Sequence, residues 1–121
     1  MLLSLNHVTV LSADFERTEH FYCDLLGMRA GPRPALSMPG RWLYVGDEPL
    51  LHVLPRTNTS QVTGVAPLDH FAFTAQNMPA FEQRLTAAGQ PFARKQLSDG
   101  STWQIFLDDP DGVHVELNFG S

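Results

Sequence analysis

Four side chains of metal-binding type stand at matching places in two similar halves of the chain. His70 follows His7 at an offset of 63 residues, and Glu116 follows His52 at an offset of 64. Burying such polar groups in a sheet without partners is costly, and a bound metal would satisfy them. Three histidines and one carboxylate suit a first-row divalent ion such as Ni, Zn, Fe, Mn or Co, whereas Ca and Mg favour oxygen ligands. We therefore predict one such ion bound by His7, His52, His70 and Glu116.

The offsets arise because the sequence repeats one order of elements. The first half runs LNHVTVLSADFERTEHFYCDLLGMRAG and then GRWLYVGDEPLLHVLP. The second half runs LDHFAFTAQNMPAFEQRLTAAGQPFA and then STWQIFLDDPDGVHVELNF, and a polar link over residues 55–67 separates the two. Each half is typical of a strand, a helix, a glycine stop and further strands. The sequence predicts a single α+β domain over residues 1–121, built from two βαβββ modules at about 1–55 and 67–120.

Strand alternation predicts that the four ligands share one type of sheet face. In LNHVTV, His7 and Thr9 alternate with the apolar Val8 and Val10. Side chains two residues apart in a strand point to the same face. The same pattern places Glu116 on a face with His114 and Asn118, opposite Val113, Val115 and Leu117. We expect the apolar faces to pack under the helices and the ligand-bearing faces to form a second, concave surface. The other predicted strands are WLYV, LLHVL, LDHFAFT, PFARKQ, TWQIFL and VHVELNF.

Capping residues set the limits of two predicted helices. The first covers roughly residues 14–26, begins at a Ser12 or Asp14 cap and stops at Gly27. The second begins at an Asn77 cap, holds Pro79 in its first turn and stops at Gly89. The apolar sides of the two helices are predicted to comprise Phe15, Tyr22, Leu25 and Leu26, and Phe81, Leu85 and Ala88.

Composition limits the possible partners and compartments. The chain has 121 residues and a formal net charge of −5, so nucleic acid is not expected as a partner. Its one cysteine, Cys23, cannot form an internal disulfide. The start MLLSLNHVTV lacks a basic leader region, and no apolar run approaches the ~20 residues of a membrane span. We expect a soluble, cytoplasmic protein without membrane contact, and a homodimer because open sheets leave edges that another chain can cover.

The segments LNHVTV with HFYCDLLGM, WLYVGDEPLLHV, LDHFAF and FLDDPDGVHVEL resemble the vicinal oxygen chelate superfamily of glyoxalases, extradiol dioxygenases and fosfomycin or bleomycin resistance proteins. This resemblance implies a glyoxalase-like domain whose curled mixed sheets surround a metal-lined cavity. It places the metal ligands at His7, His52, His70 and Glu116, as the repeat does. It also implies a small-molecule substrate that chelates the ion through adjacent oxygens, and Lewis-acid catalysis in a lyase or isomerase. By the same analogy, Trp42 and Phe106 line the substrate cavity.

The family leaves several activities open. Glyoxalase I type isomerases usually carry a carboxylate where this chain has His52, so Glu116 is the remaining candidate for the catalytic base. An extradiol dioxygenase would use His7, His70 and Glu116 as its triad. A fosfomycin-resistance-like transferase would need a cationic cradle for a phosphonate, and a bleomycin-resistance-like protein would bind a drug without catalysis. The available cations are expected to be solvated surface charges: Arg94, Lys95, Arg29, Arg33 and Arg41.

The remaining polar residues have structural explanations. We expect His20 to be exposed beside Glu19, and His114 to lie at a rim or an interface. Cys23 is expected to be a packed or partly exposed thiol. Asp109–Gly112 predicts a tight turn between the last two strands.

Overall fold

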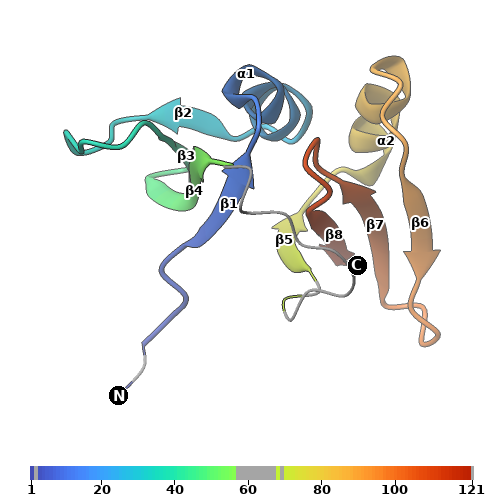
Figure 1. Cartoon of the computed structure of the whole chain (residues 1–121). Helices are drawn as coiled ribbons and strands as arrows, with labels where there is room; N and C mark the ends of the chain where they lie inside the picture. Colours follow the sequence, from blue (N-terminus) through green and yellow to red (C-terminus); the bar gives the residue numbers. More distant parts are fainter. Residues whose placement is uncertain (2, 57–67, 69, 121) are drawn as a thin grey trace. The chain divides into compact units, whose positions relative to one another are not determined.

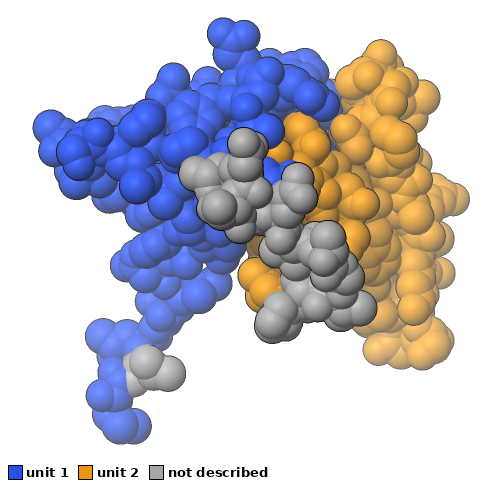
Figure 2. All heavy atoms as spheres, in the orientation of Figure 1, with its two compact units in different colours: residues 1–61 blue, residues 62–121 orange. Residues whose placement is uncertain are grey.

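The computed structural model describes residues 1, 3–56, 68 and 70–120. The chain divides into two compact units, unit 1 of residues 1–61 and unit 2 of residues 62–121 (Figure 2). Most of the predicted polar link, residues 57–67, lies outside the described residues. Within the described part of the chain, no helix is long and apolar enough to cross a membrane.

Unit 1 is a four-stranded mixed sheet with one helical segment (Figure 1). The strands have the order β1-β4-β3-β2, in which β1 and β4 are parallel and the other neighbours are antiparallel. The elements are β1 (Val8–Ser12), α1 (Phe15–Glu19), the π-helix η1 (His20–Leu25), β2 (Arg29–Gly31), β3 (Arg41–Val45) and β4 (Glu48–Pro55).

Unit 2 repeats this arrangement in the order β5-β8-β7-β6, again with one parallel pair, β5 and β8. Its elements are β5 (Phe71–Ala75), α2 (Met78–Ala87), β6 (Ala93–Gln96), β7 (Thr102–Asp108) and β8 (His114–Gly120). The predicted α+β fold of two βαβββ modules is therefore confirmed.

Strand register confirms the alignment of the two halves. In unit 1, His52 lies between Thr9 of β1 and Trp42 of β3. In unit 2, Glu116 lies between Ala72 of β5 and Phe106 of β7. The offsets of 63 and 64 read from the sequence thus connect residues at equivalent places in the two sheets.

The first strand of each unit begins one residue after the metal ligand predicted for it, His7 in unit 1 and His70 in unit 2. β1 starts at Val8 and β5 starts at Phe71, so His7 and His70 directly precede their strands. The prediction that LNHVTV is strand from its first residue is wrong, because pairing with β4 begins only at Val8 opposite Leu51. Leu3 and Leu5 are exposed.

The first helical segment begins at the Asp14 cap. The Asp14 side chain accepts hydrogen bonds from the backbone N–H groups of Glu16 and Arg17. Ser12, the alternative cap, instead forms a buried 2.6 Å hydrogen bond with Thr18. The second half of the segment is π-helical, which the 3.6-residue periodicity did not predict, and the segment ends before Gly27 at φ 90°.

The second helix agrees with its predicted caps. Asn77 has a left-handed backbone, φ 64°, and its side chain accepts a hydrogen bond from the Ala80 N–H. Gly89 follows the helix at φ 68°. Leu85 is buried, but Ala88 is exposed, so the predicted apolar stripe ends one turn earlier.

Each unit buries its own set of apolar side chains. Alternate residues of the central strands supply most of them, in agreement with the predicted strand parity. The buried apolar residues of unit 1 are Val10, Phe21, Tyr22, Leu25, Met28, Leu43, Leu51 and Val53, and those of unit 2 are Leu85, Ile105, Leu107, Val115, Leu117 and Phe119.

Candidate functional site

Glu116 is a buried carboxylate near the middle of the unit 2 sheet. Strand β8 lies between β5 and β7, so Glu116 has Ala72 on one side and Phe106 on the other. Only 9% of the residue is exposed. Burial of a carboxylate is costly unless its oxygens have partners.

Hydrogen bonds within the sheet hold one oxygen of this carboxylate. Asn118 donates from Nδ2 to Glu116 Oε2 over 2.8 Å. Gln104 of β7 donates from Nε2 to Asn118 Oδ1 over 3.0 Å. Sequence reasoning noted that Asn118 shares a face with Glu116 but gave neither amide a role. The sequence did not indicate that Gln104 and Asn118 lie opposite each other, because this pairing depends on the register of β7 and β8.

The second oxygen of Glu116 faces a histidine. Glu116 Oε1 lies 3.6 Å from His70 Nε2. Two ligand atoms that are each about 2.0–2.2 Å from one zinc-like ion are separated by roughly 3–4 Å, so this spacing fits two ligands of a common ion. His70 and Glu116 therefore fit the predicted donor set.

The equivalent position of unit 1 holds a stack of three rings. The His52 ring stacks on Trp42 with centroids 4.2 Å apart and on His7 with centroids 3.9 Å apart. The His7 and His52 planes differ by only 10°. Burial lowers the pKa of His52, and the nearby His7 and Arg33 charges act in the same direction. The neutral ring, which is the form that binds metals, is thereby favoured at His52.

The stacked arrangement does not direct both rings of unit 1 at one ion. A histidine nitrogen binds a metal through a lone pair in the plane of its ring. Because the His7 and His52 rings are nearly parallel, their lone pairs lie in separate planes. Joint binding therefore requires one ring to turn, and His7 is the exposed one, held at Nδ1 by a 2.8 Å hydrogen bond to Asn6.

The structure thus brings the four predicted ligands together in pairs, His7 with His52 and His70 with Glu116. Over residues 1, 3–56, 68 and 70–120, no group of three or more His, Cys, Asp or Glu side chains could hold a metal ion. The four-ligand site and the metal-lined cavity stay predictions. Trp42 and Phe106 are both half-buried beside the ligand positions, and their role in lining a substrate cavity also stays a prediction.

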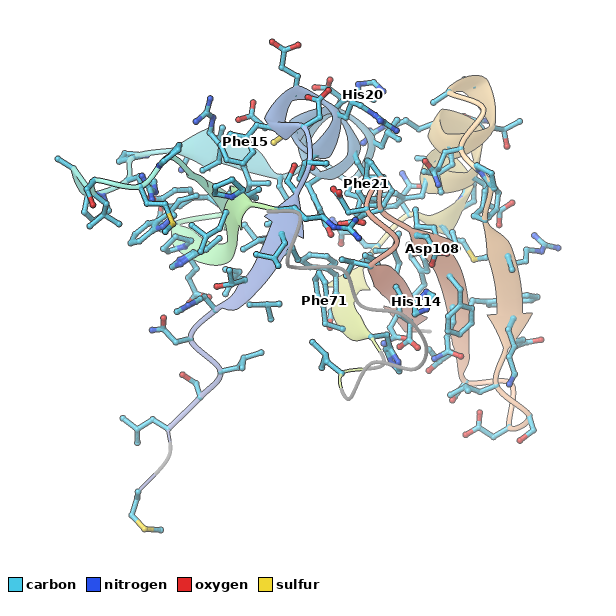
Figure 3. The ribbon with its side chains drawn as sticks, in the orientation of Figure 1. Phe15, His20, Phe21, Phe71, Asp108 and His114 are labelled. Carbon is cyan, nitrogen blue, oxygen red and sulfur yellow. The ribbon has the colours of Figure 1, made fainter. Side chains whose placement is uncertain are left out.

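Most of the other polar residues have the surroundings that the sequence indicated. Two exposed histidines pair with carboxylates: His114 with Asp108 at 2.6 Å (Figure 3), and His20 with Asp24 at 2.9 Å. The Asp109 side chain accepts hydrogen bonds from the backbone N–H groups of Asp111 and Val113, which confirms the predicted turn.

The predicted surface cations are exposed except for Arg33, which is half-buried. Arg94 pairs with Glu82 and Arg41 pairs with Glu19, both on partly exposed side chains. Arg33 differs from the prediction, because its Nε atom is buried and has no hydrogen-bond partner among the described residues. The close approach of Arg33 to Gly40 explains this burial: a Cβ at Gly40 would lie 2.8 Å from Arg33 Nη2.

Comparison with known proteins agrees with this architecture. Residues 4–117 match the family described as the Glyoxalase/Bleomycin resistance protein/Dioxygenase superfamily. The chain is 32% identical over 123 residues to Glyoxylase I 4 of Arabidopsis thaliana, covering 96% of this chain and 70% of that protein. It is 31% identical over 128 residues to Glutathione transferase FosA of Serratia marcescens, covering 100% of this chain and 84% of that protein.

A solved structure has the same fold. The crystal structure of a glyoxalase family protein from Bacillus anthracis superposes with a TM-score of 0.80 at 22% identity, covering 100% of this chain and 98% of that one. The repeated βαβββ units, the family match over nearly the full length and two relatives above 30% identity lead to one conclusion. The chain belongs to the glyoxalase/bleomycin resistance protein/dioxygenase superfamily.

Proposed function

We propose that this protein is a divalent-metal-dependent enzyme of the glyoxalase type, which carries out lyase or isomerase chemistry on a small substrate held through two adjacent oxygens. The observation that carries the proposal is the buried Glu116, with one oxygen held by Asn118 and the other 3.6 Å from His70. In this arrangement, Oε1 on the side of His70 is the oxygen that would bind a metal ion or take a proton.

His70 and Glu116 would supply two ligands of the proposed site, and His7 and His52 would supply the others once His7 has left its stacked position. A bound Ni, Zn, Fe, Mn or Co ion would stabilise the negative charge that develops on the substrate oxygens. In an isomerase, Glu116 takes a proton from one substrate carbon and returns it to the neighbouring carbon. Trp42 and Phe106, next to the ligand positions, would exclude water from the substrate.

The metal content of the purified protein tests the proposal. We expect about one first-row ion per chain in the wild type, and loss of the ion in Glu116→Ala. The matched control is Glu48→Ala, which removes an exposed carboxylate at the start of β4 and should keep the metal. If the wild type binds no metal, even after reconstitution with each of the five ions, the proposed enzyme is excluded.

The identity of the ion and a parallel assay separate the chemistries. Activity supported by Ni, Co or Zn favours isomerisation. Oxygen uptake that depends on Fe or Mn, with a catechol as substrate, would instead indicate ring cleavage.

A second candidate is a glutathione transferase that acts on a phosphonate. The 31% identity with Glutathione transferase FosA over the whole chain favours it. Arg33 also favours it, because a phosphonate needs a nearby cation and Arg33 is close enough to His52 to lower the pKa of that histidine. The test is the consumption of glutathione in the presence of fosfomycin and Mn²⁺, by wild type and Arg33→Gln. If the protein is a transferase, the wild type consumes glutathione and Arg33→Gln consumes it more slowly. If the protein is an isomerase, neither protein consumes glutathione in this assay.

A further inference from the structure

The amides of Gln104 and Asn118 form a directed chain of hydrogen bonds that ends on Glu116. Gln104 Nε2 donates to Asn118 Oδ1 at 3.0 Å, and Asn118 Nδ2 donates to Glu116 Oε2 at 2.8 Å. Because Asn118 accepts from Gln104 and donates to Glu116, the orientation of the Gln104 amide fixes that of the Asn118 amide. We define Gln104, Asn118 and Glu116 as the amide relay.

The strands place these three side chains on one face. Gln104 and Asn118 are directly opposite each other in the β7–β8 ladder. Glu116 and Asn118 are two residues apart on β8, so they point to the same side of the sheet. Rigid sheet positions hold a functional group more accurately than loops do.

The repeat shows that the fold itself does not require the relay. At the offset that relates Glu116 to His52, the residue of unit 1 that corresponds to Asn118 is Leu54. The residue that corresponds to Gln104 at the same offset is Gly40. The amides therefore accompany the carboxylate and are absent from the module that carries histidine in its place.

We infer that Gln104 and Asn118 are positioning residues for Glu116, which keep Oε2 engaged by the protein and turn Oε1 toward His70 and the ligand. This inference rests on the proposed function, in which Glu116 binds the ion. Hydrogen bonds from the protein to metal ligands orient them, and their loss typically weakens metal affinity by about 10–100-fold.

Titration of metal-free protein with Co²⁺ tests the relay. We expect Asn118→Leu, which introduces the residue of unit 1, to weaken Co²⁺ binding by about 10–100-fold. Gln104→Leu should give a smaller loss. Since Gln104 acts through Asn118, the double variant should bind no more weakly than Asn118→Leu alone. Gln96→Leu, an exposed glutamine on β6, is the matched control and should bind as the wild type does. Asn118→Ala provides a second variant if Asn118→Leu fails to fold.

A second measurement does not depend on the metal. In metal-free protein, the side-chain amide NMR resonances of Asn118 should shift in Glu116→Ala and in Gln104→Leu, and remain in place in Gln96→Leu. Unchanged resonances in Glu116→Ala would overturn the relay.

The two readouts separate failure of the relay from failure of the proposed function. If the wild type binds no Co²⁺ or other first-row ion, the proposed function fails, and the resonances alone decide whether the relay exists. If the wild type binds Co²⁺ and both Asn118 variants bind it equally well, the relay is wrong as a positioning device while the metal site stands. A purely structural pair would lower the melting temperature of the variants without changing their Co²⁺ affinity.

Discussion

His52 and Glu116 occupy equivalent sheet positions but have opposite surroundings. His52 lies between the rings of Trp42 and His7, and its burial, together with the nearby His7 and Arg33 charges, lowers its pKa and favours the neutral ring. Glu116 instead accepts a hydrogen bond from the Asn118 amide on one of its oxygens. The repeated backbone therefore presents two different ligand types, and the neighbouring side chains are matched to each.

Cys23 gives a prediction at the scale of one residue. Burial raises the pKa of its thiol, and the Glu19 and Asp24 carboxylates add to this effect. The thiolate is the reactive form, so alkylation by iodoacetamide should have a pH midpoint above that of the same chain unfolded in urea. Because the folded thiol holds its proton more tightly, the protonated Cys23 stabilises the folded state below the pKa of the unfolded thiol. This stabilisation is lost as pH rises from that pKa through the higher pKa of the folded thiol.

The control for this prediction is Glu19→Gln, which removes one of the two carboxylates and should move the midpoint down. A folded midpoint at or below the unfolded one would contradict the prediction.

The helices were largely predictable from local signals. Asn77 and Gly89 lie where the sequence placed the start and stop of α2, since capping depends on residues close in the chain. The π-helical half of the first segment was not predictable, because the spacing of its apolar residues indicates a helix and does not distinguish a π-helix from an α-helix. The start of β1 was misplaced for a similar reason: strand limits depend on the partner strand.

At the scale of elements, the start of α2 is sensitive to one residue. Asn77→Ala removes the hydrogen bond from the Ala80 N–H to the Asn77 side chain. It also places alanine, which has a Cβ, in a left-handed backbone conformation. We expect a loss of about 1–3 kcal/mol of unfolding free energy, measured by urea denaturation. Asn77→Gly relieves the backbone cost and should lose only a few tenths of a kcal/mol.

Gln83→Ala, at an exposed position of α2, is the control and should unfold as the wild type does. Equal losses for Asn77→Ala and Asn77→Gly would show that the left-handed backbone does not matter here.

At the scale of the molecule, the repeat was the most informative feature of the sequence. It led to the equivalence of His7 with His70 and of His52 with Glu116, which the strand registers support. The ring stack of His52 and the amide relay could not be predicted, because both depend on which side chains meet across neighbouring strands. The buried Nε of Arg33 could not be predicted either, because it depends on how the segment between β2 and β3 brings Arg33 close to Gly40.

The edges of the two sheets bear on assembly. β1 and β2 are the outer strands of one sheet, and β5 and β6 are those of the other. Outer strands leave backbone groups that another chain can pair with. The homodimer stays a prediction, which the mass in solution by light scattering would test.

The proposed four-ligand site requires residues of both units, and this gives the last prediction. His7→Ala and His52→Ala in unit 1 should each weaken metal binding, as should His70→Ala in unit 2, because each removes one nitrogen ligand. His20→Ala, an exposed histidine paired with Asp24, is the matched control and should keep its metal. Full metal content in both unit 1 variants would mean that His70 and Glu116 bind the ion without them, and that the ring stack of His7, His52 and Trp42 serves another purpose.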